Sequence, residues 1–245
     1  MKNLFSLSVL LFAVINLWAD GGFLWQCNDG GKPRMIKCTG MPQFDARISN
    51  QKKASFQSVD GRTVLRLDGT SAYVGHAPEL DMTGGFILEA TFKPDFKAIQ
   101  NWKWMGLISK GKNYSSGYAL MFNPQGAILL TLKTDAEMLW FQTKAGAVKD
   151  GVEQTIAVAV NNGLAKIYVN GKLFAQRKYK GKLADAGHPF YIGSGYYGYY
   201  GTVRDVKLNK YSDDALPENR ELAAAGKIHE CSGDAGAGDG HIKSA

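Results

Sequence analysis

Residues 155–176 read TIAVAVNNGLAKIYVNGKLFAQ, and this stretch decides the fold class. Two turn signals, Asn161-Asn162-Gly163 and Asn170-Gly171, separate short runs that are rich in Val, Ile, Ala and Leu. Asn-Gly supplies the two residues with positive φ that a type I′ hairpin turn requires. The stretch therefore predicts a three-stranded antiparallel meander.

The same kind of pattern extends in both directions along the chain. Residues 86–93, FILEATFK, send alternate apolar side chains to one face, as a half-buried strand does. Short apolar runs between Gly, Asn and Asp breaks predict further strands at 105–110, 117–122, 127–133, 138–143, 155–160, 165–169, 173–176, 190–192 and 202–208. Only residues 217–225 look helical. We therefore expect an all-β protein, a two-sheet antiparallel β-sandwich (jelly roll) with a short C-terminal helix.

The length of 245 residues suits a single domain of this class. In residues 1–19, Lys2 precedes an apolar run that is too short to span a bilayer comfortably, and Ala19 ends a cleavage-like site. We read this segment as a secretory signal peptide; an N-terminal membrane anchor is the alternative. We expect an irregular lead-in at 20–60, the sandwich domain at 61–228 and a disordered tail at 229–245. The mature chain has no transmembrane segment on this reading.

The chain has three cysteines, Cys27, Cys38 and Cys231. An exported protein meets an oxidising compartment, where cysteines pair. Cys27 and Cys38 flank the turn-rich sequence NDGGKP, so we expect them to close a small disulfide loop. Cys231 is then free, or pairs with one of the other two. We expect the protein to be secreted and extracellular, or else periplasmic or at the cell surface.

The charge balance is basic, with 29 Lys and Arg against 22 Asp and Glu. Only residues 172–182 are densely basic. Such a surface could favour an acidic polysaccharide or an anionic cell surface as partner, but a solvated, soluble face is the simpler explanation. The chain lacks zinc-finger, RNP and helix-turn-helix patterns, so we do not expect nucleic acid as a partner.

The order of the motifs resembles the laminin-G-like family of the concanavalin A-like lectin/glucanase superfamily. Seven segments carry the resemblance, each weak alone and specific only in order: LDGTSAYV at 67–74, GFILEATFKP at 85–94, LISKG at 107–111, GYAL at 117–120, IYVNGK at 167–172, YIG at 191–193 and GTVRDVKL at 201–208. Residues 153–158, EQTIAV, depart from the family because they lack its Trp and His. The resemblance implies a β-sandwich of the jelly-roll type and a binding function.

The resemblance also implies a structural calcium ion in many relatives. Asp68 corresponds to the family's opening Asp, and Asp205 is the second candidate ligand. In the closing strand, however, Arg204 stands where the family commonly has Asp. Its guanidinium would pair with Asp68 and replace the ion, because calcium prefers six to eight oxygen ligands. Both alternatives stay open at this point.

Aromatic side chains suggest where a ligand would bind. The segment GYYGYYG at 195–201 carries Tyr196, Tyr197, Tyr199 and Tyr200 between glycines, and Trp102 and Trp104 lie in a second connection. Sugar C–H faces stack on such rings, and phenol oxygens bond hydroxyl groups. Alternatively, some of the tyrosines pack inward, and one or both tryptophans belong to the core.

Catalytic patterns are missing from the sequence. Glucanases of this fold carry an E-x-D-x-x-E strand, whereas Glu89 has Thr91 and Lys93 on its face. Gly-x-Ser-x-Gly, His-Glu-x-x-His and phosphate-loop motifs are absent as well. We therefore expect a non-catalytic binding module for an extracellular glycan, with a cell-surface protein as the alternative partner and polysaccharide degradation as the third hypothesis.

Overall fold

The protein is described here from a computed structural model, which covers residues 22–27, 34–99, 104–111, 116–184, 186–194 and 196–220. The expected signal peptide, most of the expected tail helix, Trp102 and Cys231 lie outside these residues. Within them, no helix is long and apolar enough to cross a bilayer.

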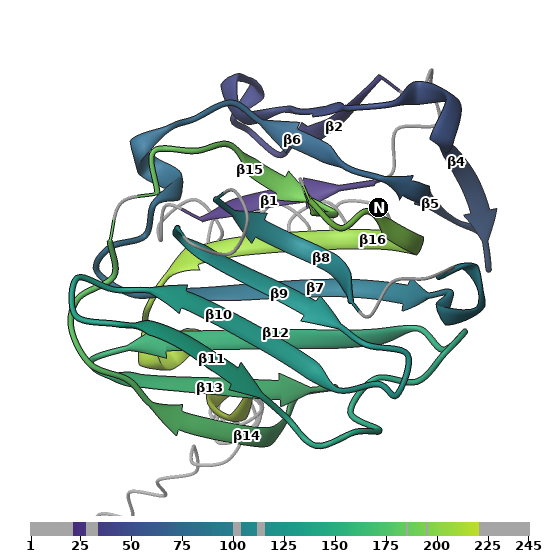
Figure 1. Cartoon of the computed structure of the whole chain (residues 1–245). Helices are drawn as coiled ribbons and strands as arrows, with labels where there is room; N and C mark the ends of the chain where they lie inside the picture. The colour runs from purple at the N-terminus through teal and green to yellow at the C-terminus, as the bar shows by residue number, and fades with distance from the viewer. Residues whose placement is uncertain are drawn as a thin grey trace, which may run out of the picture.

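The regular structure of the described chain is almost entirely antiparallel strand, and the strands lie in two facing layers in Figure 1. One layer has the order β11-β10-β9-β8-β15-β6-β3 and the other the order β1-β16-β7-β12-β13-β14. Strand β2 pairs with both β1 and β3 and joins the layers into one hydrogen-bonded path. The predicted all-β, antiparallel class is confirmed. The division into two separate sheets stays a prediction, because the pairing is continuous.

The strands of the first layer and the joining strand β2 are short, with six residues or fewer each. Their bounds are β2 Met35–Cys38, β3 Ala46–Ile48, β6 Ala72–Val74, β8 Met105–Lys110, β9 Tyr118–Phe122, β10 Ile128–Lys133, β11 Met138–Gln142 and β15 Phe190–Ile192. The second layer contains β1 Phe23–Gln26, β4 Ala54–Val59, β5 Arg62–Thr70, β7 Phe86–Pro94, β12 Gln154–Asn161, β13 Leu164–Val169, β14 Lys172–Lys178 and β16 Tyr199–Lys210.

The predicted meander is present as β12, β13 and β14. Its two turns place Asn162 at φ 45° and Gly163 at φ 78°, then Asn170 at φ 50° and Gly171 at φ 80°. All four residues thus adopt the left-handed conformation that type I′ turns need. The local turn chemistry accounts for this part of the fold.

The prediction of an irregular segment at residues 20–60 is wrong, because four strands, β1 to β4, lie there. Trp25 of β1 is completely buried in the core. Its ring stacks on that of Phe190 with the centroids 4.9 Å apart, and its Nε1 donates a hydrogen bond of 2.8 Å to the carbonyl of Phe44. The folded domain therefore includes the strands from Phe23 onward and does not begin at residue 61.

The structure shows no disulfide between Cys27 and Cys38, both of which are buried. Cys38 lies opposite Trp25 in the β1–β2 pair, so the two cysteines stand diagonally across the ladder. Burial raises the pKa of the Cys38 thiol to about 11, which keeps it protonated and weakly nucleophilic near neutral pH. The predicted disulfide stays a prediction.

The C-terminal segment covers the outer face of the second layer. A 3-10 turn at Asp213–Ala215 precedes a helix that begins at Pro217, as expected, and its described part ends at Arg220. The Glu218 carboxylate accepts hydrogen bonds from Tyr168 Oη at 2.8 Å and Lys166 Nζ at 3.2 Å, so the start of the helix is fixed to β13.

Candidate functional site

The tyrosine-rich connection between β15 and β16 forms an ordered turn. The buried Ser194 Oγ accepts hydrogen bonds from the backbone N–H groups of Tyr196, at 3.1 Å, and Tyr197, at 3.2 Å. The two rings meet edge to face with centroids 4.8 Å apart. Tyr196 is 55% exposed. The turn therefore presents an aromatic ring to solvent from a well-supported backbone.

Two glycines allow this turn to lie directly against β5. A Cβ atom on Gly198 would come within 2.5 Å of the Gly69 carbonyl carbon, and a Cβ on Gly69 would lie 2.5 Å from Tyr200 Oη. Gly69 also has a φ of 68°, which favours glycine. Because both positions lack a side chain, the Tyr200 ring lies across β5 at Gly69.

The turn and its surroundings enclose a cavity of about 190 Å³. Its aromatic walls are Trp104, Tyr196, Tyr197 and Tyr200, and the remainder of its lining is Lys53, Gly69, Ile99, Met105 and Gly198. We call this the aromatic pocket. Tyr200 N donates to Met105 Sδ at 3.1 Å, which ties β16 to β8 at the cavity. A cavity of this size takes one small ring rather than a drug-sized ligand.

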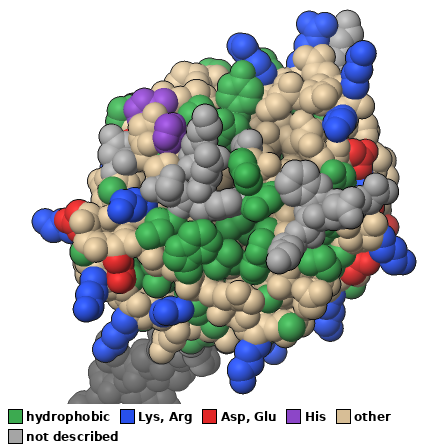
Figure 2. Space-filling model, in the orientation of Figure 1, with side chains coloured by type: hydrophobic (Ala, Val, Ile, Leu, Met, Phe, Trp, Pro, Cys, Tyr) green, Lys and Arg blue, Asp and Glu red, His purple; other side chains and the backbone are tan. Residues whose placement is uncertain are grey.

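Trp104 and Tyr197 also extend the site toward the outer face of the first layer. They pack on a cluster formed by Ala119, Met121 and Leu129. Figure 2 shows apolar side chains gathered in the middle of this face and Lys and Arg side chains mostly around its rim. The aromatic pocket thus lies beside an apolar surface.

The structure brings four of the six predicted aromatic residues together and separates one. Tyr199 is completely buried in the core, contrary to its prediction as a ligand-binding residue, because β16 begins there and alternation turns its ring inward. Its hydroxyl donates to the Thr202 carbonyl at 3.3 Å, and burial raises its pKa well above the usual range. Trp102 lies outside the described residues. Sequence reasoning missed Lys53, since it falls in the segment expected to be irregular.

A second cavity, of about 330 Å³, lies next to the aromatic pocket. We call it the charged pocket, and its ionisable residues are Arg66, Lys93, Lys97, Asp95 and Asp150. Arg66 is held by two carboxylates, through Nε to Asp68 at 2.8 Å and through Nη2 to Asp95 at 3.0 Å. Its guanidinium is therefore fixed in position.

The proposed calcium ligands do not form a cation site. Asp68 lies opposite Tyr200 in the β5–β16 pair. Asp205 lies five residues beyond Tyr200 on β16, which separates the backbones of Asp68 and Asp205 by roughly 16 Å along the strand. The Arg204 side chain pairs with Asp205 at 2.9 Å and Glu153 at 2.6 Å, not with Asp68 as the sequence suggested. Among the described residues, no cluster of three or more His, Cys, Asp or Glu side chains has the placement of a metal site. These donors do not fit calcium, which requires several carboxylates.

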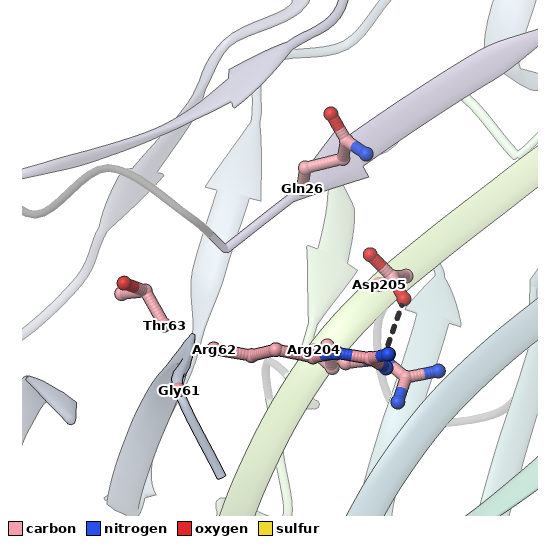
Figure 3. Close-up of a pocket in the computed structure, with 6 residues that line it drawn as sticks. All are labelled: Gln26, Gly61, Arg62, Thr63, Arg204 and Asp205. Atoms are coloured by element: carbon pink, nitrogen blue, oxygen red, sulfur yellow. Dashed lines mark hydrogen bonds and ion pairs between the residues drawn. The ribbon is translucent and has the colours of Figure 1, made fainter. Parts of the chain in front are cut away.

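A third cavity, of about 450 Å³, opens where β1 ends and β5 diverges from β16. Figure 3 shows Arg62 and Arg204 extending along its floor, with Gln26, Thr63 and Asp205 around them. None of the described residues that line it is aromatic.

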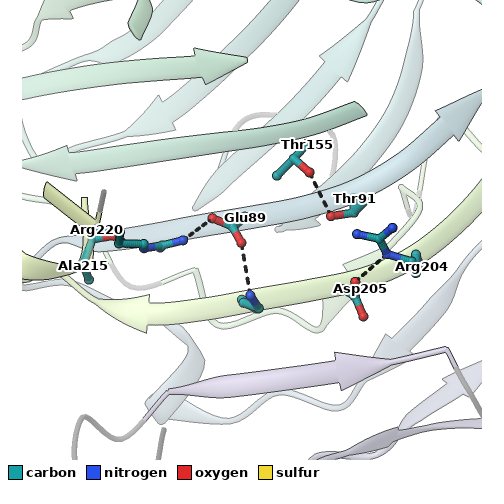
Figure 4. Close-up of polar contacts among 8 residues, drawn as sticks. Glu89, Thr91, Thr155, Arg204, Asp205, Ala215 and Arg220 are labelled. Atoms are coloured by element: carbon teal, nitrogen blue, oxygen red, sulfur yellow. Dashed lines mark hydrogen bonds and ion pairs between the residues drawn. The ribbon is translucent and has the colours of Figure 1, made fainter. Parts of the chain in front are cut away.

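Glu89 is surrounded by cations rather than by a second carboxylate. Its side chain accepts from Lys207 Nζ at 3.2 Å and from Arg220 Nη1 at 2.6 Å (Figure 4). Burial pushes the pKa of Glu89 upward, but the charges of Lys207 and Arg220 outweigh it and the net pKa is lowered. A glycosidase acid needs a raised pKa and a partner carboxylate within about 5 to 10 Å. Glu89 instead has the environment of a structural ion pair.

A family model for the concanavalin A-like lectin/glucanases superfamily matches residues 68–213, more than half of the chain. The chain belongs to this superfamily. The resemblance expected from the ordered motifs is thereby confirmed, and the matched range includes Asp68, the tyrosine turn and both pockets' β16 residues. The superfamily match does not extend to β1–β4, which the structure nevertheless includes in the sheet. No curated protein matches the chain by sequence.

Solved structures share the superfamily fold with the chain at low identity. The binding domain of Paraclostridial Mosquitocidal Protein 1 superposes with a TM-score of 0.63 at 12% identity, covering 82% of this chain and 51% of that one. The botulinum neurotoxin serotype D binding domain superposes with a TM-score of 0.60 at 13% identity, and the match covers 84% of this chain and 51% of that one. The CBM40 of a Ruminococcus gnavus IT-sialidase, bound to α2,3-sialyllactose, gives 0.52 at 16%, covering 63% and 95%. The chain thus spans about half the length of the two toxin domains.

Proposed function

We propose that this protein is an exported, non-catalytic module that binds a glycan in the aromatic pocket. One observation carries the proposal: Trp104, Tyr196, Tyr197 and Tyr200 converge on one small cavity, with Tyr196 largely exposed. Aromatic rings that keep one face open provide the apolar surface on which the C–H face of a sugar packs. The Tyr hydroxyl groups supply donors and acceptors for its hydroxyl groups.

The physical character of the pocket supports this reading. The walls of the pocket are well supported. Ser194 holds the tyrosine turn through two hydrogen bonds, and the contact between Gly69 and Gly198 sets the distance of this turn from β5. A preorganised site loses little conformational entropy on binding. The glycan-binding relatives among the structural neighbours agree with the proposal, but they share only the fold with this chain. Export to an extracellular or cell-surface location is part of the proposal and follows from the N-terminal segment.

The test is binding of the mature chain to a glycan array and to insoluble polysaccharides, with and without EDTA. We expect Tyr196→Ala and Trp104→Ala each to reduce binding about two- to twelvefold, since stacking on an aromatic ring contributes about 0.5–1.5 kcal/mol beyond area burial. Phe174→Ala is the matched control, because Phe174 is a 44% exposed aromatic on β14, away from the pocket. Equal losses in all three variants, or no glycan signal, would reject the proposal. If EDTA abolished glycan binding, the expectation of a bound cation would be reinstated.

A protein-binding role is the second candidate, and β14 favours it. This strand ends the hydrogen-bonded path, so no strand of the described residues pairs with its outer edge. Leu173 and Phe174 on it are 50% and 44% exposed. Exposed edge strands accept a strand from a partner protein. A specific partner in a pull-down that is lost in Phe174→Ala, with no glycan signal, would select this function.

A further inference from the structure

Among the described residues, Lys53 is the only charged side chain that lines the aromatic pocket. It ends the 3-10 turn Gln51–Lys53 and is exposed. No carboxylate among the described residues forms an ion pair with it. The pocket thus combines aromatic walls with one uncompensated ammonium group.

The charged pocket repeats this arrangement with more cations. Lys93 and Lys97 are exposed, and neither has an ion-pair partner in the described chain. The carboxylates of that pocket are already engaged. Asp95 Oδ2 accepts from Arg66 at 3.0 Å, and Asp150 Oδ1 accepts from Phe96 N at 2.7 Å. The available charge in this cavity is therefore positive, although its formal charges nearly balance.

The two pockets are consecutive along one pair of strands. In the β5–β16 ladder, Tyr200 stands opposite Asp68 and Thr202 opposite Arg66. Tyr200 lines the aromatic pocket, and Thr202 and Arg66 line the charged pocket. Two residues along a strand correspond to roughly 6.6 Å. The boundary carboxylate, Asp68, has its Oδ1 bonded to Arg66.

We infer that the glycan is an acidic one. Resting on the proposed function, this inference assigns one sugar ring to the aromatic pocket, with its anionic group at Lys53. The next anionic group of the same chain lies in the charged pocket, at Lys93 and Lys97. Ammonium groups recognise carboxylates and sulfates through charge-assisted hydrogen bonds, and both anions share this chemistry. Neutral sugars would leave three ammonium groups without partners at the site.

The experiment compares ligands that differ only in charge. Polygalacturonate is set against its fully methyl-esterified form, and dextran sulfate against dextran, with the full mature chain and a titration of NaCl. We expect at least one anionic polymer to bind at least tenfold more tightly than its neutral counterpart, with the difference shrinking as salt screens the charges. The two anionic arms distinguish a carboxylate ligand from a sulfate ligand.

Variants then locate the effect. Lys53→Gln should weaken binding of the anionic polymer about tenfold, as expected for one charge-assisted contact, and leave the neutral polymer unchanged. Lys178→Gln is the matched control, because this exposed lysine belongs to the basic stretch on β14. Equal losses in both variants would overturn the inference in favour of general electrostatic attraction. Equal binding of charged and neutral polymers would overturn it while the glycan proposal stands, and failure of all four polymers together with a blank array would overturn both.

Discussion

Gly198→Ala tests whether the aromatic pocket depends on the close contact between the tyrosine turn and β5. The added Cβ would lie 2.5 Å from the Gly69 carbonyl carbon, 2.6 Å from its oxygen and 2.7 Å from its Cα. Ordinary van der Waals contact begins at 3.4 Å, so the turn must move away from β5 by almost 1 Å. All three clashing atoms are backbone, which cannot rotate out of the way as a side chain would.

Overpacking of this kind costs about 1–3 kcal/mol. For a domain of this size the cost lowers Tm by about 2–12 °C. Gly75→Ala is the matched control, because a Cβ there meets nothing within 4 Å and its φ is not positive. Urea unfolding would measure the loss of stability. The glycan assay would measure the loss of affinity that follows if Tyr196 and Tyr200 are displaced. If Gly198→Ala matches Gly75→Ala in both assays, the contact does not define the pocket.

Three further predictions concern stability, each measured by urea unfolding. Lys110→Met should lower the free energy of unfolding by about 3–5 kcal/mol, because it leaves the buried carboxylate of Asp81, which lies 2.8 Å from Lys110 Nζ, without its cation. The double variant Lys110→Met/Asp81→Leu should recover most of this loss. If it does not, the ion pair does not account for the cost. Glu89→Gln should destabilise at pH 7, and the difference from the parent protein should shrink as the pH is lowered. Because the folded pKa of Glu89 is lowered, its stabilising contribution is fully present above the unfolded pKa of about 4.3 and is lost as the pH falls through the folded pKa. Trp25→Ala should lower the free energy of unfolding by about 3–5 kcal/mol. A loss close to zero would instead agree with an irregular segment at residues 20–60.

The sequence predicted those parts of the fold whose signals are local. The meander rests on Asn162-Gly163 and Asn170-Gly171, where the turn residues and both strands lie within a few positions of one another. The strands β1 and β2 have only four residues each, too few to show a period. The partner of β1 is far away in sequence, since Phe23 pairs with Leu208. Pairing over such a separation cannot be derived from local periodicity.

The site was predictable to the same degree. Tyrosines between glycines indicated an aromatic turn, and the structure places Tyr196, Tyr197 and Tyr200 at one cavity. Tyr199 could not be separated from them, because all four have the same local chemistry. Lys53 joins the pocket through the β4–β5 hairpin, which places Ala54 opposite Leu67. The Asp60-Gly61 turn of this hairpin, with φ values of 50° and 73°, is a local signal that the sequence interpretation overlooked.

Both the alternation of β16 and its interruption determine how one strand serves core and site. Its pairing with β5 shifts register between Tyr199 and Tyr200, and its pairing with β7 shifts between Val203 and Asp205. The first shift leaves the alternation intact, so Tyr199 lies in the core and Tyr200 reaches the aromatic pocket. At the second shift two successive residues, Arg204 and Asp205, are both partly exposed, and both line the third cavity. Bulges re-aim side chains in this way and occur often beside functional sites. The aromatic pocket thus follows from regular alternation along β16, and the cavity at Arg204 from the point where β16 departs from it.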